Sequence, residues 1–402
     1  MKTAKVNTAE KQTRLYDLDW IRVIVFGLLI LYHVGMFFVP WDWHIKNNAL
    51  STDLQYPMRF VNLWRLHILF MISGMGTWLA LGRRSGGEYA WERVKRLLIP
   101  LIFGMLVIVP PQVYLERLVY GGYEGSYFSF LFRDAFHGTY PEGNVSWHHL
   151  WFLPYLLLFS LVLAPVFVYM RRYPANLWVK FLSKVMAHPT GMLIFILPLF
   201  LTEVFLQPRF PSTHALFGDW YNLVLYFLLF FFGFSLMAAG RVFRDSICNN
   251  RLMFLLAGVA GILAHIMLRS HFPGFPGLIS PLIRTVGYWF MILGLLGYAA
   301  RYLNRESRLI RYCNKAVYPF YILHQTVIVI IGYMVMYKSW HMGWKALIMV
   351  AGTFGTCWLV YEFLIRRLPP LRPLFGVKKQ RSVPGEISKG LLTSRQVQPN
   401  FS

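Results

Sequence analysis

Two residues able to do proton and anion chemistry, Arg22 and His33, lie in the first apolar segment, eleven positions apart. At about 100° per residue, eleven positions make about three helical turns plus 20°, so both side chains share one helix face, roughly 16 Å apart along its axis. His33 is too deep and too short to reach the membrane surface. Because ionisable groups are costly in a bilayer, this spacing predicts a polar cavity along the helix.

A pair of arginines enters the third apolar segment. Arg93 and Arg96 are one turn apart on one helix face, and guanidinium groups bond phosphate oxygens in forked geometry. Alone, the pair reads as an ordinary cluster of cytoplasmic charge, and Arg22 as a side chain tied to Asp19 three residues earlier. Together, at the same membrane side, the three arginines predict an anion-binding site.

The second apolar segment adds three candidates. It starts with Arg65 and His67, and we expect His67 at a depth similar to that of His33. Ser73 and Gly74 follow on the same segment. Small residues let membrane helices approach closely, so packing is the favoured interpretation of the Ser-Gly pair and substrate contact by Ser73 the alternative.

Histidines and aromatic residues elsewhere complete the candidate set. His148 and Trp151 close a long external segment, where aromatic faces would serve as platforms for sugar rings. His324, followed by Gln325, lies inside the ninth apolar segment, where core hydrogen bonding and function are equally good interpretations. A neutral imidazole can take a proton from a hydroxyl whose oxygen attacks an acyl carbon. We therefore predict that an activated acyl donor from the cytoplasm meets an external hydroxyl near His33.

The elements that must position these groups are membrane helices. Hydrophobic residues make up 56% of the 402-residue chain and charged residues 14%, against about 25% charged in soluble domains. The 14 Trp, 23 Tyr and 34 Phe suit membrane–water interfaces. We predict an all-α integral membrane protein with about ten transmembrane helices, near 18–39, 59–81, 97–119, 151–170, 189–206, 220–240, 252–270, 281–300, 316–337 and 343–365.

The net charge of +23 follows the same topology. Most of the 40 basic residues fall at both termini and in the segments after even-numbered helices, so both termini are predicted to be cytoplasmic. Membrane topology thus explains the charge, and the expected partners include membrane lipid but no nucleic acid. We predict a membrane domain over 1–375 and a disordered cytoplasmic tail over 376–402. Three cysteines without metal or disulfide spacing give no reason to expect a metal site.

With these residues in place, the chain resembles the acyltransferase-3 family of integral-membrane acyltransferases. The resemblance is carried by Arg22 with ten residues before His33, by 70–74 (Phe-Met-Ile-Ser-Gly) and by 93–96 (Arg-Val-Lys-Arg). It implies ten core helices, an acyl-CoA donor and an acyl ester on a saccharide. It also implies that His33 is catalytic and that Arg22, Arg93 and Arg96 bind the donor. The segment around His324 is not one of the motifs that define the family broadly.

Over nearly its full length the chain also resembles family members that succinylate osmoregulated periplasmic glucans, through Trp43-His44, 148–153 and 361–376 among other segments. The likeness implies a multi-pass protein of the bacterial inner membrane. It would move a succinyl or another short acyl group from cytoplasmic acyl-CoA to a periplasmic glucan, with no permanently bound cofactor. A succinyl carboxylate needs a cation, which Arg65 and His67 would supply.

Two other functions remain as alternatives. Buried His and Arg also suit a transporter or exporter of anionic or saccharide substrates, although the sequence shows no internal repeat of the kind many transporters carry. A scaffold that assists a glycan synthase is the third interpretation, and such a scaffold would tolerate loss of His33. The sequence leaves open a homo-oligomer and the choice between direct transfer and an acyl-enzyme.

Overall fold

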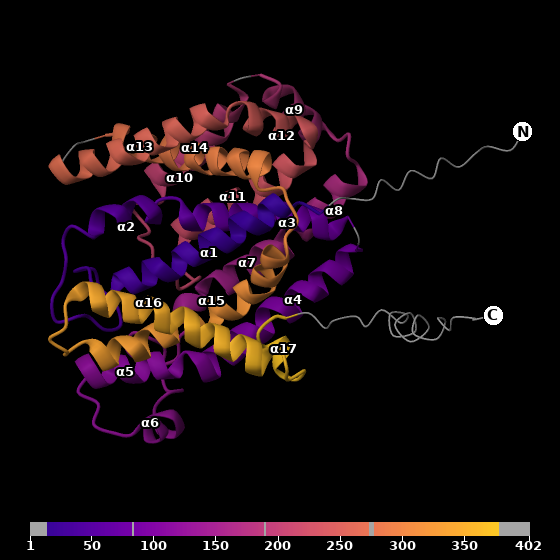
Figure 1. Cartoon of the computed structure of the whole chain (residues 1–402). Helices are drawn as coiled ribbons and strands as arrows, with labels where there is room; N and C mark the ends of the chain where they lie inside the picture. Colours follow the sequence, from indigo (N-terminus) through magenta and orange to yellow (C-terminus); the bar gives the residue numbers. More distant parts are fainter. Residues whose placement is uncertain (1–13, 83, 189, 273–276, 378–402) are drawn as a thin grey trace, which may run out of the picture.

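The structure is a computed structural model, and it describes residues 14–82, 84–188, 190–272 and 277–377 (Figure 1). Within these residues the only β-pairing is an isolated bridge between Thr139 and Val145. The helical elements are α1 (Tyr16–Met36), α2 (Gln55–Asn62), α3 (Arg65–Leu81), α4 (Gly86–Phe103), η1 (Gly104–Ile108), α5 (Pro110–Tyr120), α6 (Tyr127–Arg133), η2 (His148–Trp151), α7 (Phe152–Val162), α8 (Ala164–Arg172), α9 (Leu177–Met186), η3 (Gly191–Phe195), α10 (Ile196–Phe205), α11 (Trp220–Ala238), α12 (Arg241–Asn249), α13 (Arg251–His271), α14 (Ile279–Tyr302), α15 (Arg308–Val335), α16 (Met342–Leu359), η4 (Val360–Ile365) and α17 (Leu371–Leu374).

Seven of these helical stretches are long and apolar enough to cross a membrane, or eight if the pair α7 and α8, bent by 50°, counts as one span. The other two expected segments are helical but short: α3 has 17 residues and α10 has 10, against about 20 for a straight span. The second segment is short because the chain breaks between α2 and α3. The prediction of an all-α membrane protein is confirmed, and the number ten stays a prediction.

Helix α1 lies at the centre of the bundle. It packs against α3, α14, α15 and α16, so the segment that carries Arg22 and His33 contacts several other helices (Figure 1). In the view of Figure 1, α13 and α14 lie above α1, and α15, α16 and α5 lie below it. Polar side chains of α1 are tolerated where they face these helices rather than lipid.

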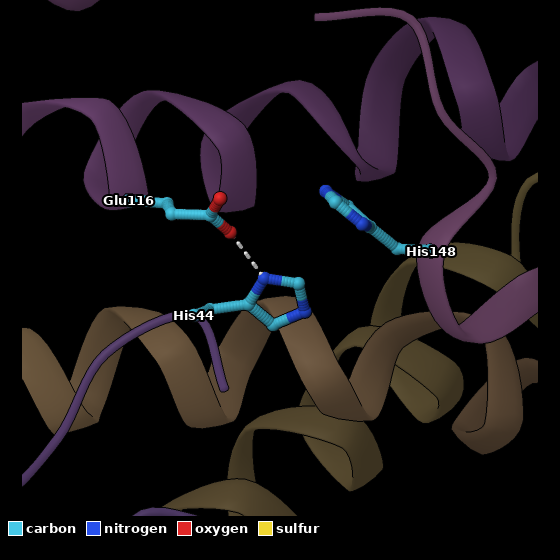
Figure 2. A group of neighbouring side chains, drawn as sticks. All are labelled: His44, Glu116 and His148. Carbon is cyan, nitrogen blue, oxygen red and sulfur yellow. Dashed lines mark hydrogen bonds and ion pairs between the residues drawn. The ribbon is translucent and has the colours of Figure 1, made fainter. Parts of the chain in front are cut away.

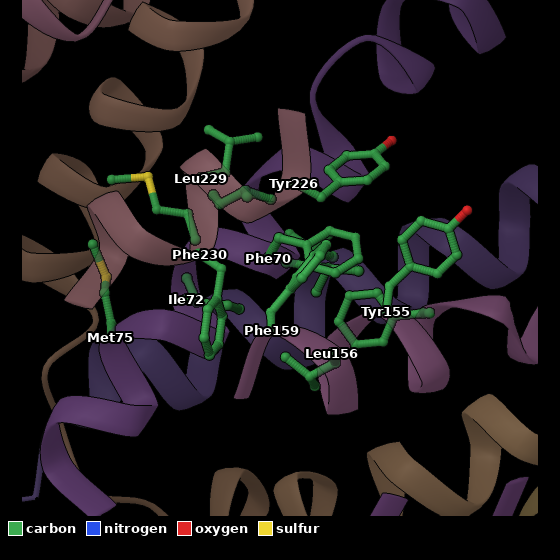
Figure 3. Packing of buried hydrophobic residues seen from close by; sticks show 14 of the residues in the cluster. Phe70, Ile72, Met75, Tyr155, Leu156, Phe159, Tyr226, Leu229 and Phe230 are labelled. Atoms are coloured by element: carbon green, nitrogen blue, oxygen red, sulfur yellow. The ribbon is translucent and has the colours of Figure 1, made fainter. Parts of the chain in front are cut away.

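Helices α3 and α11 approach each other through glycines. A Cβ on Gly74 would lie 2.0 Å from the carbonyl oxygen of Phe230, and one on Gly233 would lie 2.0 Å from that of Met71. Figure 3 shows the aromatic cluster beside this contact, where Phe70 stacks on Tyr226 with ring centroids 4.3 Å apart. The packing interpretation of Gly74 is therefore confirmed.

A break in the long helix of 86–120 sets the position of α5. The π-helical turn η1 precedes Pro110, and the Val109 N–H donates to the carbonyl of Gly104 at 2.8 Å. This irregular turn leaves the carbonyl of Ile108 available, and it accepts from Thr326 Oγ1 on α15 at 2.6 Å. A buried carbonyl without a partner would be costly, so the break ties α5 to α15 beside His324.

Both ends of the described chain lie at one end of the bundle. Arg14 and Arg372 line the same cavity, which is treated below. The basic residues of the extreme N-terminus and the predicted disordered tail, except Gly376 and Val377, lie outside the described residues. The membrane side that this end faces stays a prediction.

Candidate active site

A polar contact inside the bundle joins His33 on α1 to His324 on α15. His33 Nδ1 lies 2.8 Å from His324 Nε2, and the two rings are stacked with centroids 5.0 Å apart. His324 Nδ1 lies 2.7 Å from the carbonyl oxygen of Tyr321. A carbonyl only accepts, so Nδ1 of His324 carries the proton and Nε2 accepts from His33 Nδ1. The lone pair of His33 is then on Nε2, the geometry of a general base.

The position of His324 is fixed from a second side by His149. The ring of His149 meets that of His324 edge-on at 5.1 Å, and its Nε2 lies 3.0 Å from the carbonyl of Ile322. The carbonyl of His149 accepts from the Tyr321 hydroxyl at 2.7 Å. His324 and His149 are both buried, so the groups that hold His324 in place also keep water away from it.

A large cavity of about 1000 Å³ opens at the basic end of the bundle. Small-molecule sites occupy roughly 300–1,000 Å³, so this volume suits a large ligand. Ten basic and two acidic side chains line it, which makes it strongly attractive to an anion with several charges. They are Arg14, Arg22, Arg84, Arg93, Arg96, Arg308, Arg311, Lys315, Arg366 and Arg372, with Asp19 and Glu92.

The predicted anion-binding arginines come together in this large cavity. Arg22 donates to Asp19 Oδ1 at 3.3 Å and to Asn314 Oδ1 at 3.1 Å, so the tie to Asp19 is present and the side chain also faces the cavity. Arg93 donates to Thr77 Oγ1 at 3.2 Å, and Arg96 lines the same wall. Helix α4, capped by Ser85 through a capping box, carries both.

Ser73 also reaches this cavity. Its hydroxyl donates to the carbonyl of Leu69 in its own helix at 2.7 Å, while the residue lines the cavity wall. A hydroxyl that back-bonds to its own helix keeps its lone pairs for a ligand. Substrate contact by Ser73 thus stays a prediction with suitable geometry.

The deep end of the large cavity is closed by aromatic rings. Phe26 and Phe152 both pack against Tyr321, with ring centroids 5.5 and 6.3 Å apart. Tyr321 in turn lies 6.1 Å from the ring of His324. The cavity lining stops at this layer and does not include His33. One layer of rings therefore separates the basic cavity from the histidine pair.

A small cavity of about 360 Å³ lies beyond the histidine pair. Acidic and aromatic side chains line it, and the full lining is Asp42, Trp43, His44, Glu116, Arg117, Tyr120, Gly121 and Tyr140. Burial and the Glu116 carboxylate raise the pKa of Tyr140 to about 12, so its hydroxyl stays protonated and donates to Glu116 Oε1 at 2.9 Å. Gln325, next to His324 in the chain, lies 2.8 Å from His44 Nε2.

Residue order along the chain places the histidine pair between the two cavities. Residues from Arg14 to Phe26 line the large cavity, His33 follows, and Asp42 to His44 line the small one. The chain from α4 to α5 repeats this order, with Arg84 to Leu97 in the large cavity and Glu116 to Gly121 in the small one. The pair thus lies between a strongly basic chamber and an aromatic, mixed-charge one.

The structure separates Arg65 from His67. The guanidinium of Arg65 lies 3.3 Å above the ring of Tyr32, the neighbour of His33 in the chain, and it donates to Asn62 Oδ1 at 2.7 Å. His67 instead packs against Tyr226 and Tyr288. Residues two positions apart on a helix are about 200° apart around its axis, so Arg65 and His67 lie on nearly opposite faces of α3. Only Arg65 lies toward His33.

The side chains of His148 and Trp151 also lie in different surroundings. The ring of His148 meets that of His44 at 4.4 Å beside the small cavity. Trp151 is buried and stacks on His214, with ring centroids 4.1 Å apart. Burial lowers the pKa of His214 to about 4. Contact of Trp151 with a saccharide stays a prediction, and it would require the segment of His214 to move.

Several residues of the site were not singled out by the sequence. His149 supports His324, and a chain of amides continues from His44 through Gln325 to Gln112, whose Nε2 donates to Thr326 Oγ1 at 2.6 Å. The sequence did contain one indication that Glu116 and Gln112 belong to a site. Both are polar groups inside an expected apolar span, and such groups are rare without a function.

These features define a class: a multi-pass helical membrane protein with a hydrogen-bonded histidine pair between two cavities of different charge. The acyltransferase-3 family model, described as an acyltransferase domain, matches residues 15–362. The chain belongs to this family and is a membrane acyltransferase.

Two relatives of the chain carry the same name. It is 24% identical to the glucans biosynthesis protein C of Salmonella typhi over 384 residues, which cover 91% of this chain and 95% of that protein. The protein of the same name from Escherichia coli strain K12 / DH10B is 26% identical over 161 residues, 39% of this chain and 40% of that protein. No solved structure matches the chain.

Proposed function

We propose that this membrane acyltransferase transfers a short acyl group, succinyl in the first place, from cytoplasmic acyl-CoA to a hydroxyl of a periplasmic glucan across the bacterial inner membrane. One observation carries the proposal. The hydrogen-bonded pair of His33 and His324 lies between a large basic cavity and a small aromatic one. A donor with phosphates and an acceptor with hydroxyls need these two chambers on either side of one base.

The large cavity suits coenzyme A in volume and charge. Phosphates would bond to Arg22, Arg93 and Arg96, whose guanidinium groups converge on one chamber. The pantetheine arm is less polar and would lie along the deeper wall, where Leu69, Ile72 and Leu153 replace the arginines. The thioester would then arrive at the layer formed by Phe26, Phe152 and Tyr321, and these rings would have to part to admit it.

The chemistry follows from the tautomers of the pair. His33 Nε2 takes the proton of the acceptor hydroxyl as its oxygen attacks the thioester carbon. The carbon–sulfur bond breaks, and the sulfur leaves with that proton as the free thiol. Throughout, His33 Nδ1 donates to His324 Nε2, which orients the ring and stabilises the transient imidazolium. The transfer is direct, and no acyl-enzyme is needed.

Succinyl is the proposed acyl group because a fixed cation lies beside His33. Arg65 is buried, lies over Tyr32 and keeps its Nε free of any hydrogen bond to a described residue. The carboxylate of a succinyl group could form an ion pair with this guanidinium, since a buried unpaired charge is costly. An acetyl group has no carboxylate and would leave the guanidinium unpaired.

A glucan is the proposed acceptor on two grounds. The small cavity joins Trp43, Tyr120 and Tyr140 with the carboxyl groups of Asp42 and Glu116. The aromatic rings offer apolar faces to a ligand, and the carboxylates can accept hydrogen bonds from its hydroxyls. The relatives are named for glucan biosynthesis. The acceptor would enter from the end opposite the basic cavity.

The decisive experiment uses the purified full chain in lipid nanodiscs, supplied with succinyl-CoA or acetyl-CoA and a periplasmic glucan. We expect release of free CoA and an ester mass on the glucan, both lost in His33→Ala. If the wild type releases no CoA and forms no ester, yet moves glucan across proteoliposomes, the chain acts on that substrate as a transporter and the proposal fails. Mass spectrometry of glycans from cells with and without the chain would name the acyl group.

A further inference from the structure

Three side chains with metal-binding atoms meet beside the small cavity. His44 comes from the segment after α1, Glu116 from α5 and His148 from the start of η2 (Figure 2). One ligand atom of each lies within 4.8 Å of the other two. Because the three are far apart in the sequence, their linear spacing gives no sign of this group, and only the fold brings it together.

The donor atoms point toward one another. Figure 2 shows His44 and Glu116 joined by their hydrogen bond, with the ring of His148 opposite them; His44 Nδ1 lies 2.5 Å from Glu116 Oε2. His148 Nε2 is buried and has no hydrogen-bond partner among the residues that the structure describes. The hydrogen bond between His44 and Glu116 gives a polar partner to two of the three side chains. It leaves the buried nitrogen of His148 unexplained, and such a nitrogen costs free energy unless a ligand satisfies it.

The backbone holds His148 in a strained conformation. Its φ is 39°, in the left-handed region that residues other than glycine rarely adopt. The hydroxyl of Ser146 accepts from the His148 N–H at 2.9 Å and stabilises this turn. Strain of this kind persists where surrounding structure over-determines it, commonly at functional sites. Here it directs an imidazole toward a carboxylate and a second imidazole.

We infer that His44, Glu116 and His148 form a site for one divalent transition-metal ion of the zinc class. Two imidazole nitrogens and one carboxylate oxygen are a common ligand set for zinc, and three protein ligands leave a fourth position open. His44 and Glu116 also line the small cavity, so water or a hydroxyl from that cavity can complete the coordination. On binding, the proton on His44 Nδ1 moves to Nε2 of the same ring, so Nδ1 can give its lone pair to the metal and the imidazole stays neutral.

The groups behind the ligands match those found around metal sites. The second oxygen of Glu116 accepts from the Tyr140 hydroxyl at 2.9 Å. The other nitrogen of His44 lies 2.8 Å from the side-chain amide of Gln325. That amide can present its oxygen to an N–H after a flip. Ligating histidines and carboxylates are typically oriented by such outer partners.

The test is a cobalt titration of the full chain, produced without a polyhistidine tag, stripped with chelator and kept in detergent. Four-coordinate Co²⁺ with nitrogen and oxygen ligands gives visible absorption bands. We expect one Co²⁺ per chain with these bands, displaced by Zn²⁺. His148→Ala and Glu116→Gln should each weaken binding at least tenfold. His271→Ala, which removes an exposed histidine at the end of α13, is the matched control and should bind as the wild type does.

Thermal unfolding guards against a folding artefact. Zn²⁺ should raise the Tm of the wild type and of His271→Ala, because a ligand of the folded state stabilises it, and should leave that of Glu116→Gln unchanged. A wild type that binds no stoichiometric Co²⁺, or a His148→Ala variant that binds it equally well, overturns the site. Since the readout is metal binding, failure of the acyl-transfer proposal would leave this result standing.

Discussion

His33 and His324, 291 residues apart in the sequence, share a hydrogen bond of 2.8 Å with their rings nearly parallel at 13°. The carbonyl of Tyr321 fixes the proton on the far nitrogen of His324. The pair is therefore directional: a backbone oxygen orients His324, His324 orients His33, and His33 presents its free nitrogen. The same logic operates wherever a base is held in one tautomer by a second group.

Loss of either histidine should lower turnover by different amounts. His33→Ala removes the base, and we expect kcat to fall by about 10²–10⁴-fold, the usual contribution of general base catalysis. His324→Ala leaves the base but not its orientation, so a smaller fall is expected, together with a shift of the pH–kcat profile. Both are measured as CoA release under saturating donor. Equal, small losses in the two variants would mean that the pair is structural.

The arginines of the large cavity should act on donor binding. A hydrogen bond to a charged group contributes about 1.5–3 kcal/mol, so Arg93→Gln or Arg96→Gln should raise the KM for acyl-CoA by roughly 10–100-fold with little change in kcat. Dephospho-CoA thioesters, which lack one phosphate, should lose less from these substitutions than the full donor. Arg305→Gln, an exposed residue outside the cavity lining, is the control.

Arg65 should discriminate between acyl groups. Arg65→Ala removes the cation beside Tyr32 and is expected to lower kcat/KM for succinyl-CoA at least tenfold more than for acetyl-CoA. Arg65→Lys keeps the charge and should retain part of the preference. The variant His67→Phe, on the opposite face of α3, should affect both donors alike. If Arg65→Ala reduces both donors equally, the carboxylate contact is excluded.

The sequence predicted what depends on one helix, and it failed where several segments meet. The shared face of Arg22 and His33, and the pairing of Arg93 with Arg96, follow from helical periodicity alone. The partnership of His33 with His324 does not, because it depends on α1 and α15 packing side by side. Arg65 and His67 show the limit most clearly, since similar depth suggested one site although two positions on a helix face opposite ways.

Helix ends were a second limit. Composition cannot show that the second apolar segment breaks between α2 and α3, because the apolar character continues through Leu63 and Trp64. The π-helical turn before Pro110 is likewise invisible to a hydropathy window. Both irregularities lie close to the site, where local rules are commonly broken in favour of function.

The glycine contact between α3 and α11 should be intolerant of any side chain. A Cβ on Gly74 meets a backbone carbonyl at 2.0 Å, and a backbone atom cannot turn away as a side chain can. Gly74→Ala is expected to cost about 1–3 kcal/mol, as overpacking does, and to lower the Tm in detergent. Gly27→Ala, where a Cβ meets nothing within 4 Å, should leave the Tm unchanged. Equal Tm values for the two variants would contradict the close approach.

His214 offers a prediction on pH, because burial lowers its pKa to about 4 in the folded chain against about 6.5 when unfolded. Between these values the unfolded chain binds the proton and the folded chain does not. Stability from the neutral ring is therefore fully present above pH 6.5 and is lost as the pH falls toward 4.

The measurement compares the wild type with His214→Asn, since asparagine tolerates the positive φ of 56° at this position. The wild type should have the higher Tm at pH 7.5, where the ring stacks on Trp151 in its neutral form. The difference in Tm should shrink steadily between pH 6.5 and 4.5. The control variant His271→Asn changes an exposed histidine. The difference in Tm between the wild type and this variant should not change with pH. A Tm difference that stays constant across this range would show that His214 takes up its proton equally in both states, and the stacked ring would then contribute by packing alone.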